Sequence, residues 1–268
     1  MEWKDEGVIL GVRRHGEGSV IIEAMTANHG RHLGLARGGR SARMRPILQP
    51  GNSVHLTWRA RLDEHLGQYS VDADALRAAR LMETQIGLYG LQLLAAHLRL
   101  LPERDPHRAM YDAALVILDN LDEPAKAAHL LIRFELALLD DLGFGLDLGK
   151  CAVSGQTSDL VFVSPKSGKA VSREAGQPWA SKLLALPGFL SQQGQTPKLA
   201  YSPSDVEAGF GLSGYFLDRH VWAPRGIRPP DERKGVIKNV LKALPELQGE
   251  ALEQIVENRM ENENDEAG

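Results

Sequence analysis

Cysteine and serine recur at the spacing of a metal site in the stretch 151–168, which reads C-A-V-S-G-Q-T-S-D-L-V-F-V-S-P-K-S-G. Two residues separate Cys151 from Ser154, and two residues separate Ser164 from Ser167. The strand-like run D-L-V-F-V lies between these two pairs. Four cysteines at these positions would suit a tetrahedral zinc site. Only one of the four is a cysteine, so the stretch is either a zinc hairpin that has lost its ligands or a chance grouping of small polar residues.

A structural zinc ion is not expected at this hairpin. A serine hydroxyl is a poor zinc ligand near neutral pH, because such a site needs soft thiolates. The sequence therefore predicts a hairpin without metal, and the chain as a whole offers no motif for another cofactor. We expect the hairpin to be held by apolar packing of Val153, Leu160, Phe162 and Val171.

Motifs of enzymes are missing from the sequence. It has no phosphate-binding P-loop, no dinucleotide fingerprint, no H-E-x-x-H and no nucleophile elbow. His97 and His129 lie in predicted helices without a partner at metal or triad spacing. The sequence predicts that the protein is not an enzyme.

The composition is that of an ordinary globular protein, with 43% hydrophobic and 25% charged residues. The sequence contains no run of about 18 apolar residues, so no membrane span is expected. The first residues, M-E-W-K-D-E-G-V, do not read as a signal peptide, and a single cysteine suits a reducing compartment. We therefore expect a cytoplasmic protein.

Charge is distributed unevenly along the chain. The net charge is -4, yet residues 31–61 hold seven arginines and no Asp or Glu, while residues 246–268 hold eight acids and one base. Local charge, rather than the sum, decides what a polyanion meets. The candidate nucleic-acid-binding residues are these seven arginines and two that precede them: Arg13, Arg14, Arg31, Arg37, Arg40, Arg43, Arg45, Arg59 and Arg61.

Five short strands are predicted in the first part of the chain. The clearest is Ser53–Leu62, in which Val54, Leu56, Trp58, Ala60 and Leu62 alternate with polar and basic residues. The other four are Glu6–Arg14, Ser19–Ala27, Arg31–Arg37 and Leu66–Val71. Five strands at this spacing predict a small barrel of the oligonucleotide-binding (OB) type, although an SH3-like barrel would give much the same pattern.

A glycine-rich loop with four arginines, G-L-A-R-G-G-R-S-A-R-M-R-P, lies between the third and fourth predicted strands. Its arginines can reach phosphates from a mobile backbone. Single-strand binders also offer exposed rings to bases. Trp58 falls on the core face, and Trp3 and Tyr69 fall at the margins. The pattern indicates binding to the phosphate backbone, independent of base sequence.

The middle of the chain reads as packed helices. Asp72–Leu101 holds two or three helical stretches. The next helix is capped by Asp105, another runs from Pro124 to Leu142, and a further one is capped by Ser202. The predicted fold class is α+β and multidomain, with an N-terminal OB-fold β-barrel followed by an α-helical domain that carries a small degenerate zinc-ribbon-like hairpin. The predicted boundaries are 1–75 for the barrel, 76–148 and 175–248 for the helical domain, 149–174 for the hairpin, and 249–268 for an acidic, disordered tail.

Three stretches are similar to one known family. The opening, G-V-I-L followed by E-G-S-V-I-I-E-A-M-T-A-N-H-G-R and A-R-G-G-R, resembles the start of the bacterial RecO family of DNA repair proteins. L-L-I-R-F-E-L-A-L-L-D-D-L-G-F-G-L-D-L-G-K-C resembles that family's central helix, and S-G-Y-F-L-D-R-H-V-W-A-P-R-G resembles its late helix. The resemblance covers residues 1–245 in family order.

The resemblance implies a recombination mediator of the bacterial nucleoid. Family members bind single- and double-stranded DNA, anneal complementary strands and, with RecR and at some sites RecF, help to load RecA onto DNA coated by single-strand-binding protein. The acidic, hydrophobic C-terminal tail of that protein would dock on the helical domain. Many members hold zinc with four cysteines at the positions of Cys151, Ser154, Ser164 and Ser167. An RNA-binding barrel and a protein-binding scaffold stay open as alternatives.

Overall fold

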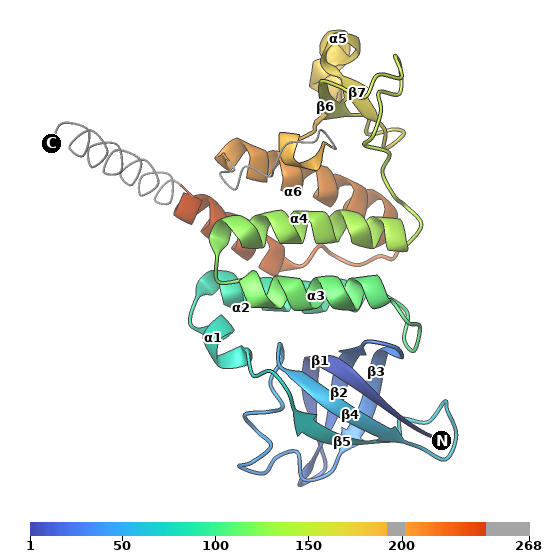
Figure 1. Ribbon diagram of the computed structural model, residues 1–268, viewed down its shortest axis with the longest axis vertical. Coiled ribbons are helices and arrows are strands. Elements are labelled where there is room, and N and C mark those ends of the chain that lie inside the picture. The colour runs from blue at the N-terminus through green and yellow to red at the C-terminus, as the bar shows by residue number, and fades with distance from the viewer. Residues whose placement is uncertain (192–201, 245–268) are drawn as a thin grey trace, which may run out of the picture.

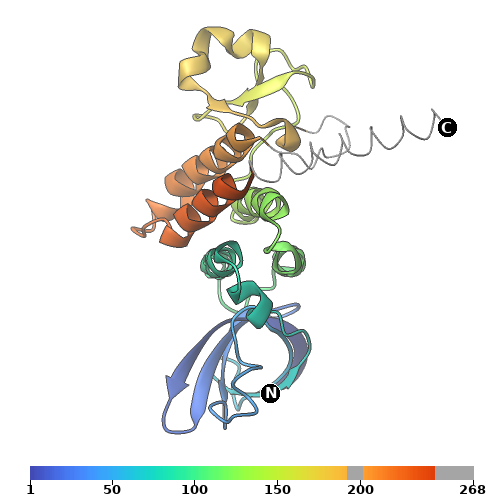
Figure 2. The same cartoon turned by 90° about the vertical axis from the view of Figure 1, so that its left-hand side faces the viewer.

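The computed structural model describes residues 1–191 and 202–244, and shows an elongated molecule (Figure 1). A β-barrel forms one end, a small sheet with a short helix forms the other, and a layer of helices lies between them (Figures 1 and 2). The predicted acidic tail, 249–268, lies outside the described residues. Within those residues, no helix has the length and apolarity that crossing a membrane requires.

The barrel is built from five strands. They are β1 (Glu2–His15), β2 (Ser19–Thr26), β3 (Gly30–Ala36), β4 (Ser53–Arg59) and β5 (Gln68–Ala73). They close in the order β1-β2-β3-β5-β4, in which β3 and β5 are parallel. This is an OB-like barrel, as the sequence predicted, with a first strand that begins four residues earlier than expected.

The barrel core follows the predicted alternation only as far as β4 continues. Val54, Leu56 and Trp58 are buried, but Leu62 is 47% exposed because the strand ends at Arg59. Tyr69, which the sequence placed at the margin, is buried in the core.

The loop between β4 and β5 closes over Trp58, whose indole Nε1 donates a hydrogen bond to the carbonyl oxygen of Leu66 at 3.0 Å. Gly67 makes this close approach possible. Its φ is +65°, and a Cβ there would lie 2.3 Å from the indole.

The helical layer contains α1 (Ala78–Met82), α2 (Gln85–Leu98), α3 (Arg108–Asn120), α4 (Pro124–Asp141), α6 (Pro203–Leu217), the π-helical η3 (Asp218–Trp222) and a last helix described over 231–244. The predicted start of α4 at Pro124 is confirmed, and so is the cap of α6, where Ser202 forms a capping box with Asp205.

The predicted cap of α3 at Asp105 is wrong, since the helix begins at Arg108 with His107 in the cap position. The reason is tertiary. The chain before α3 runs beside β3, where the backbone N–H of Arg104 donates to the carbonyl oxygen of Arg31 at 2.9 Å, and this pairing delays the helix.

The small sheet has three strands, β6 (Leu160–Val163), β7 (Ala170–Ser172) and β8 (Leu184–Ala185), in the order β7-β6-β8. Strands β6 and β7 form the predicted hairpin, and Leu160 and Val171 are buried as expected. Val153 is 75% exposed, so its predicted packing role is wrong. The sheet continues past residue 174 because α5 (Arg173–Gly176) and the 3-10 helix η1 (Gln177–Lys182) lead into β8.

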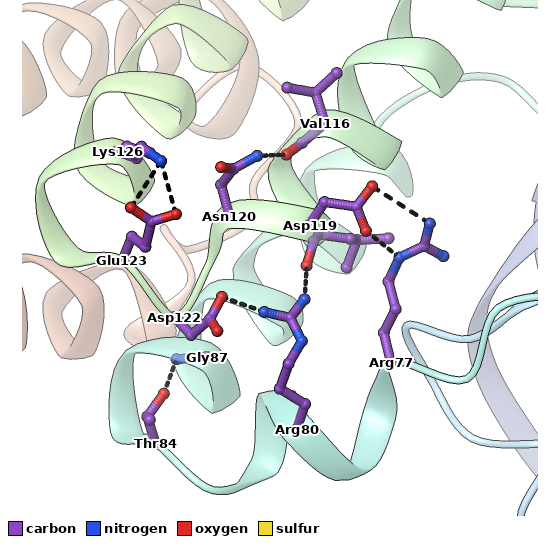
Figure 3. A network of polar contacts seen from close by, with 11 residues as sticks. Arg77, Arg80, Thr84, Gly87, Val116, Asp119, Asn120, Asp122, Glu123 and Lys126 are labelled. Carbon is purple, nitrogen blue, oxygen red and sulfur yellow. Dashed lines mark hydrogen bonds and ion pairs between the residues drawn. The ribbon is translucent and has the colours of Figure 1, made fainter.

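Arg77, at the N-cap of α1, and Arg80, within α1, connect this short helix to the end of α3 (Figure 3). Arg77 pairs with Asp119 near the end of α3 and also donates to Ser53 Oγ of β4 at 2.6 Å. Arg80 pairs with Asp122 and donates to the carbonyl oxygen of Leu118. The short helix α1 is thereby fixed between the two parts of the molecule.

A fully buried carboxylate joins the helices of the core. Glu135 of α4 accepts hydrogen bonds from Arg233 Nε at 2.8 Å and Arg233 Nη2 at 2.9 Å, and from the hydroxyl of Ser213. His97 of α2 is also fully buried, with its Nε2 3.6 Å from the Glu135 carboxylate. Burial raises the pKa of Glu135, but the charge and hydrogen bonds of Arg233, aided by His97 and Ser213, hold this pKa below its ordinary value.

Removing the cation of this pair should destabilise the fold strongly. We expect Arg233→Met to lower the free energy of unfolding by about 3–5 kcal/mol near neutral pH, because a buried carboxylate would be left without its counter-charge. In the wild type the folded pKa of Glu135 is depressed, so its contribution is complete above the ordinary value of 4.5 and is lost as pH falls through the folded pKa. Denaturant unfolding at several pH values measures both effects.

Lys234→Met is the matched control. Lys234 pairs with Asp231 at 3.1 Å, but both side chains are exposed, so its removal should change stability by less than about 0.5 kcal/mol. Equal losses in the two variants would contradict the role given to Arg233.

Candidate nucleic-acid interface

Three of the candidate arginines surround one hollow on the barrel. Arg14, Arg40 and Arg45 line a cavity of about 410 Å³ together with Val12 and Val20. Gly39, Leu48, Gln49 and Pro50 complete the lining. The hollow thus combines an apolar floor with guanidinium groups.

The loop between β3 and β4 brings two of these arginines to Arg14 of β1. Gly39 lies against Val20 of β2 so closely that a Cβ would be 2.4 Å from the valine methyl group. Leu48 inserts into the barrel core and is 4% exposed. Asn52 then ties the end of the loop, because its side-chain amide donates to the carbonyl oxygens of Pro46 and Ile47 at 2.9 Å each.

The same asparagine connects the loop to the helices. The side-chain oxygen of Asn52 accepts a hydrogen bond from the backbone N–H of Ala78, the first residue of α1, at 2.9 Å. The arginine loop is therefore anchored at both its glycine end and its asparagine end, although its arginine side chains face solvent.

The arginines around the hollow are open, in the sense that no carboxylate of the described chain neutralises them. Among the described residues, Arg14, Arg40 and Arg45 form no ion pair with a carboxylate, and the guanidinium group of Arg40 donates to the backbone carbonyl oxygen of Glu17. Arg37 and Arg43, on the same loop, are also exposed and outside the ion pairs of the described chain. Unpaired cations on a surface favour a polyanion, since binding releases its counterions.

The remaining candidates lie elsewhere on the barrel. Arg31 pairs with Glu23 at 2.9 Å and Glu103 at 3.2 Å, and its side chain is 14% exposed. Arg13 lies on the other side of β1 from Arg14 and lines a second hollow, which also contains Arg31 and Glu23.

Two candidates lie at the end of β4 and beyond it. Arg59 pairs with Glu2 at 2.9 Å and is largely exposed, and Arg61 is exposed in the loop after β4. The structure therefore divides the nine arginines into two groups. Those of the first group are exposed around the loop between β3 and β4, and those of the second either pair with acids or lie away from that loop.

Sequence reasoning missed the structural role of Arg31. Its two carboxylate partners, Glu23 and Glu103, lie outside the acid-free window that drew attention to it. Arg99 of the α2 C-terminus completes this arrangement, since its Nε is 2.8 Å from the other carboxylate oxygen of Glu23. The Arg31–Glu23 pair joins the neighbouring strands β2 and β3, whereas Glu103 and Arg99 come from the segment at and after the end of α2, which no signal in the arginine-rich window marks.

The two turns with zinc-like spacing have the same hydrogen bond. The backbone N–H of Ser154 donates to Cys151 Sγ at 3.4 Å, and that of Ser167 donates to Ser164 Oγ at 3.4 Å. The side chains present do not fit zinc, because one thiol is the only soft donor of the four. In the described part of the chain, no three His, Cys, Asp or Glu side chains gather as a metal site would require.

Cys151 is buried and its sulfur accepts three hydrogen bonds. Besides Ser154, the backbone N–H and the hydroxyl of Ser172 donate to Sγ at 3.3 and 3.4 Å. Burial raises the pKa of the thiol, but the hydrogen bonds from Ser154 and Ser172 outweigh it and lower that pKa to about 6. The sulfur is thus occupied by protein donors.

The closed five-stranded barrel, its open arginines and the attached helical layer together define a protein with the architecture of oligonucleotide-binding barrel proteins. Comparison with known families agrees with this class. The family model described as Recombination protein O N terminal matches residues 1–73, and the one described as Recombination protein O C terminal matches residues 86–228.

Curated relatives identify the family. The chain is 59% identical over 246 residues to the DNA repair protein RecO of Chelativorans sp. (strain BNC1), which covers 92% of this chain and 98% of that protein. It is 56% identical over 244 residues to the DNA repair protein RecO of Brucella abortus (strain 2308), with 91% and 98% covered, and 58% identical over 244 residues to that of Rhizobium etli (strain CFN 42), with 91% and 94% covered. The chain belongs to the RecO family of DNA repair proteins.

The titration of Cys151 tests its hydrogen bonds. Because the chain has one cysteine, the ultraviolet absorbance of the thiolate reports on this residue alone. We expect a transition near pH 6 in the native protein, and a transition at higher pH in Ser172→Ala, which loses the hydroxyl donor. Ser167→Ala, which makes no contact with the sulfur, should titrate as the wild type does. A native transition near the ordinary value of 9.0 would contradict this reading.

Metal analysis of the purified chain tests the degenerate hairpin. We expect no stoichiometric zinc after dialysis, and the same result for Cys151→Ser, because a single thiolate does not hold a structural zinc ion. One zinc per wild-type chain that disappears in Cys151→Ser would overturn the prediction.

Proposed function

We propose that this RecO-family protein binds DNA through the open arginines of its barrel and acts as a mediator in recombinational repair. One observation carries the proposal: Arg14, Arg40 and Arg45 surround one hollow, and none of them is paired with a carboxylate among the described residues. The barrel type and the family are consistent with a nucleic-acid partner.

The chemistry of the hollow suits the phosphate backbone rather than base edges. Guanidinium groups form bidentate hydrogen bonds with phosphate oxygens and remain charged at any physiological pH. The floor around Val12, Val20 and Leu48 offers no hydrogen-bond pattern that could distinguish bases. Binding through this surface would therefore depend weakly on sequence and strongly on salt.

Such a surface can promote annealing of complementary strands. Two strands repel each other through their phosphates, and neutralising these charges without gripping the bases leaves the base edges free to pair. In this proposal the protein brings the strands together and has no catalytic step, metal or other cofactor.

The proposed partners follow from the family. They are single- and double-stranded DNA, RecR, in some settings RecF, and the C-terminal tail of single-strand-binding protein, with RecA loaded onto DNA as the outcome. The site of action would be the nucleoid in the bacterial cytoplasm.

Two other functions make different predictions. An RNA-binding barrel would prefer an RNA competitor over DNA of the same sequence. A protein-binding scaffold would show no nucleic-acid affinity even at low salt.

Neutralising the hollow tests the proposal. We expect the triple variant Arg14→Gln, Arg40→Gln and Arg45→Gln to bind DNA more weakly on every sequence, and to lower the slope of log affinity against log salt by about three, because each lost phosphate contact removes about one unit. Annealing of complementary oligonucleotides precoated with single-strand-binding protein should slow in parallel. Fluorescence anisotropy over a salt series gives the slope.

A charge-matched control uses cations of the helical layer. Arg108, Lys126 and Lys234 are exposed and paired with acids three or four residues away, so replacing them with Gln removes three positive charges without changing the lining of the arginine hollow. Equal loss of DNA affinity in both triple variants would mean that net charge, rather than the hollow, determines binding.

A further inference from the structure

A tryptophan at the end of the molecule opposite the barrel is exposed to solvent. Trp179 belongs to η1, which follows α5 in the small sheet unit, here defined as residues 147–190 (Figure 1). Its side chain is 58% exposed, and η1 contains no buried residue. Tryptophan is mostly buried in folded proteins. Packing within the described chain therefore does not account for this ring.

The backbone that carries the ring is fixed on both sides. Before η1, Gly176 lies against Phe162 of β6 so closely that a Cβ would be 2.5 Å from the phenyl ring. After η1, Leu184 and Ala185 form β8, which pairs with Val163 and Phe162 of β6. The six residues of η1 thus form a short bridge between two points of the same sheet, which fixes the backbone that carries the ring.

One cation lies beside the ring. The ammonium group of Lys182 lies 5.4 Å from the centre of the Trp179 ring, at the distance of a cation–π contact. Lys182 forms no ion pair among the described residues, although the unit also contains the acids Asp147 and Glu174. The one arginine of the unit, Arg173, pairs with Asp159.

We propose that Trp179 and Lys182 form a second nucleic-acid contact, in which the ring stacks on an unpaired base and the lysine binds the adjoining phosphate. An exposed ring beside a cation is a combination with which proteins hold single strands, and it is tolerant of sequence because every base has a π-face. The inference rests on the proposed function, because it takes the ligand to be DNA, but it uses a site far from the arginine hollow.

The geometry favours a base over a protein partner. A protein interface has a contiguous apolar core around its aromatic anchors. On this unit, Val153 is the only other large apolar side chain that is strongly exposed, and it belongs to the turn that follows Cys151 rather than to η1. A lone ring with a cation matches one base and its phosphate.

This contact would distinguish single strands from duplexes. In a duplex each base is paired and stacked between neighbours, so its face is covered, whereas a single strand can turn a base onto the indole. The arginine hollow contacts only phosphates in the proposed function and accepts either form. The two ends of the molecule would therefore contribute differently to the two kinds of DNA.

The experiment compares oligothymidylate with a duplex of equal length on the full chain. We expect Trp179→Ala to weaken single-strand binding roughly 5- to 150-fold, the equivalent of about 1–3 kcal/mol for one stacked base, and to leave duplex binding unchanged. Trp179→Phe should restore most of the single-strand affinity, because phenylalanine also stacks. Oligothymidylate should quench wild-type tryptophan fluorescence more than that of Trp179→Phe, since the ring under the base is the exposed one.

Val153→Ala is the matched control, because it removes another exposed apolar side chain from the same unit and should bind both DNA forms as the wild type does. Unchanged single-strand affinity in Trp179→Ala would overturn the inference, and so would an equal loss on single strands and duplex. If the arginine variant loses DNA binding while Trp179→Ala does not, the proposed function stands and this inference falls. If the wild type binds neither DNA form, both fall.

Discussion

The carboxylate of Glu23 lies between two guanidinium groups, and the packing of the barrel against the helices depends on it. One oxygen is 2.9 Å from Arg31 of β3 and the other is 2.8 Å from Arg99 at the end of α2. Arg99 also donates to the carbonyl oxygen of Leu10 in β1 at 2.8 Å. Two strands and one helix are thus joined through a single acid that is only 18% exposed, where water screens the charges less than at an open surface. Together with the hydrogen bond from Ala78 to Asn52, this carboxylate holds the barrel and its arginine loop against the helical layer.

Much of the fold was predictable from local patterns. Alternation along residues 53–58 and the cap at Ser202 are properties of neighbouring residues, and the structure confirms both. The errors occur where a distant partner overrides the local pattern. Asp105 does not start α3 because the chain there pairs with β3, and the two-residue strand β8 is too short to show any periodicity. A strand as short as β8 forms only because β6 offers a free edge with which it can pair. The sequence of the strand itself does not reveal that edge.

The candidate site was predictable in composition but not in arrangement. Counting charges in the window from residue 31 to 61 drew attention to the arginine loop, whose exposed side chains the structure places beside Arg14. The same count gave equal weight to Arg31, whose acids come from β2 and from the segment after α2. Charge along a sequence says which residues are basic, whereas only the fold says which of them are already neutralised. Trp179 was overlooked for the same reason, since exposure is a property of the assembled surface.

The path of the chain through the helical layer has a consequence for its synthesis. Glu135 of α4 and Arg233 are 98 positions apart, and the whole small sheet unit is made between them. The barrel strands, by contrast, are complete at Ala73. At about 5–20 residues per second, the ribosome needs on the order of ten seconds after finishing the barrel before it supplies the partner of that carboxylate. From the synthesis of Glu135 until that of Arg233, 98 positions later, α4 carries an uncompensated charge on the face that will become the core, and an unpaired carboxylate disfavours burial of that face. The barrel can mature first, and the helical layer closes around the salt bridge late in translation.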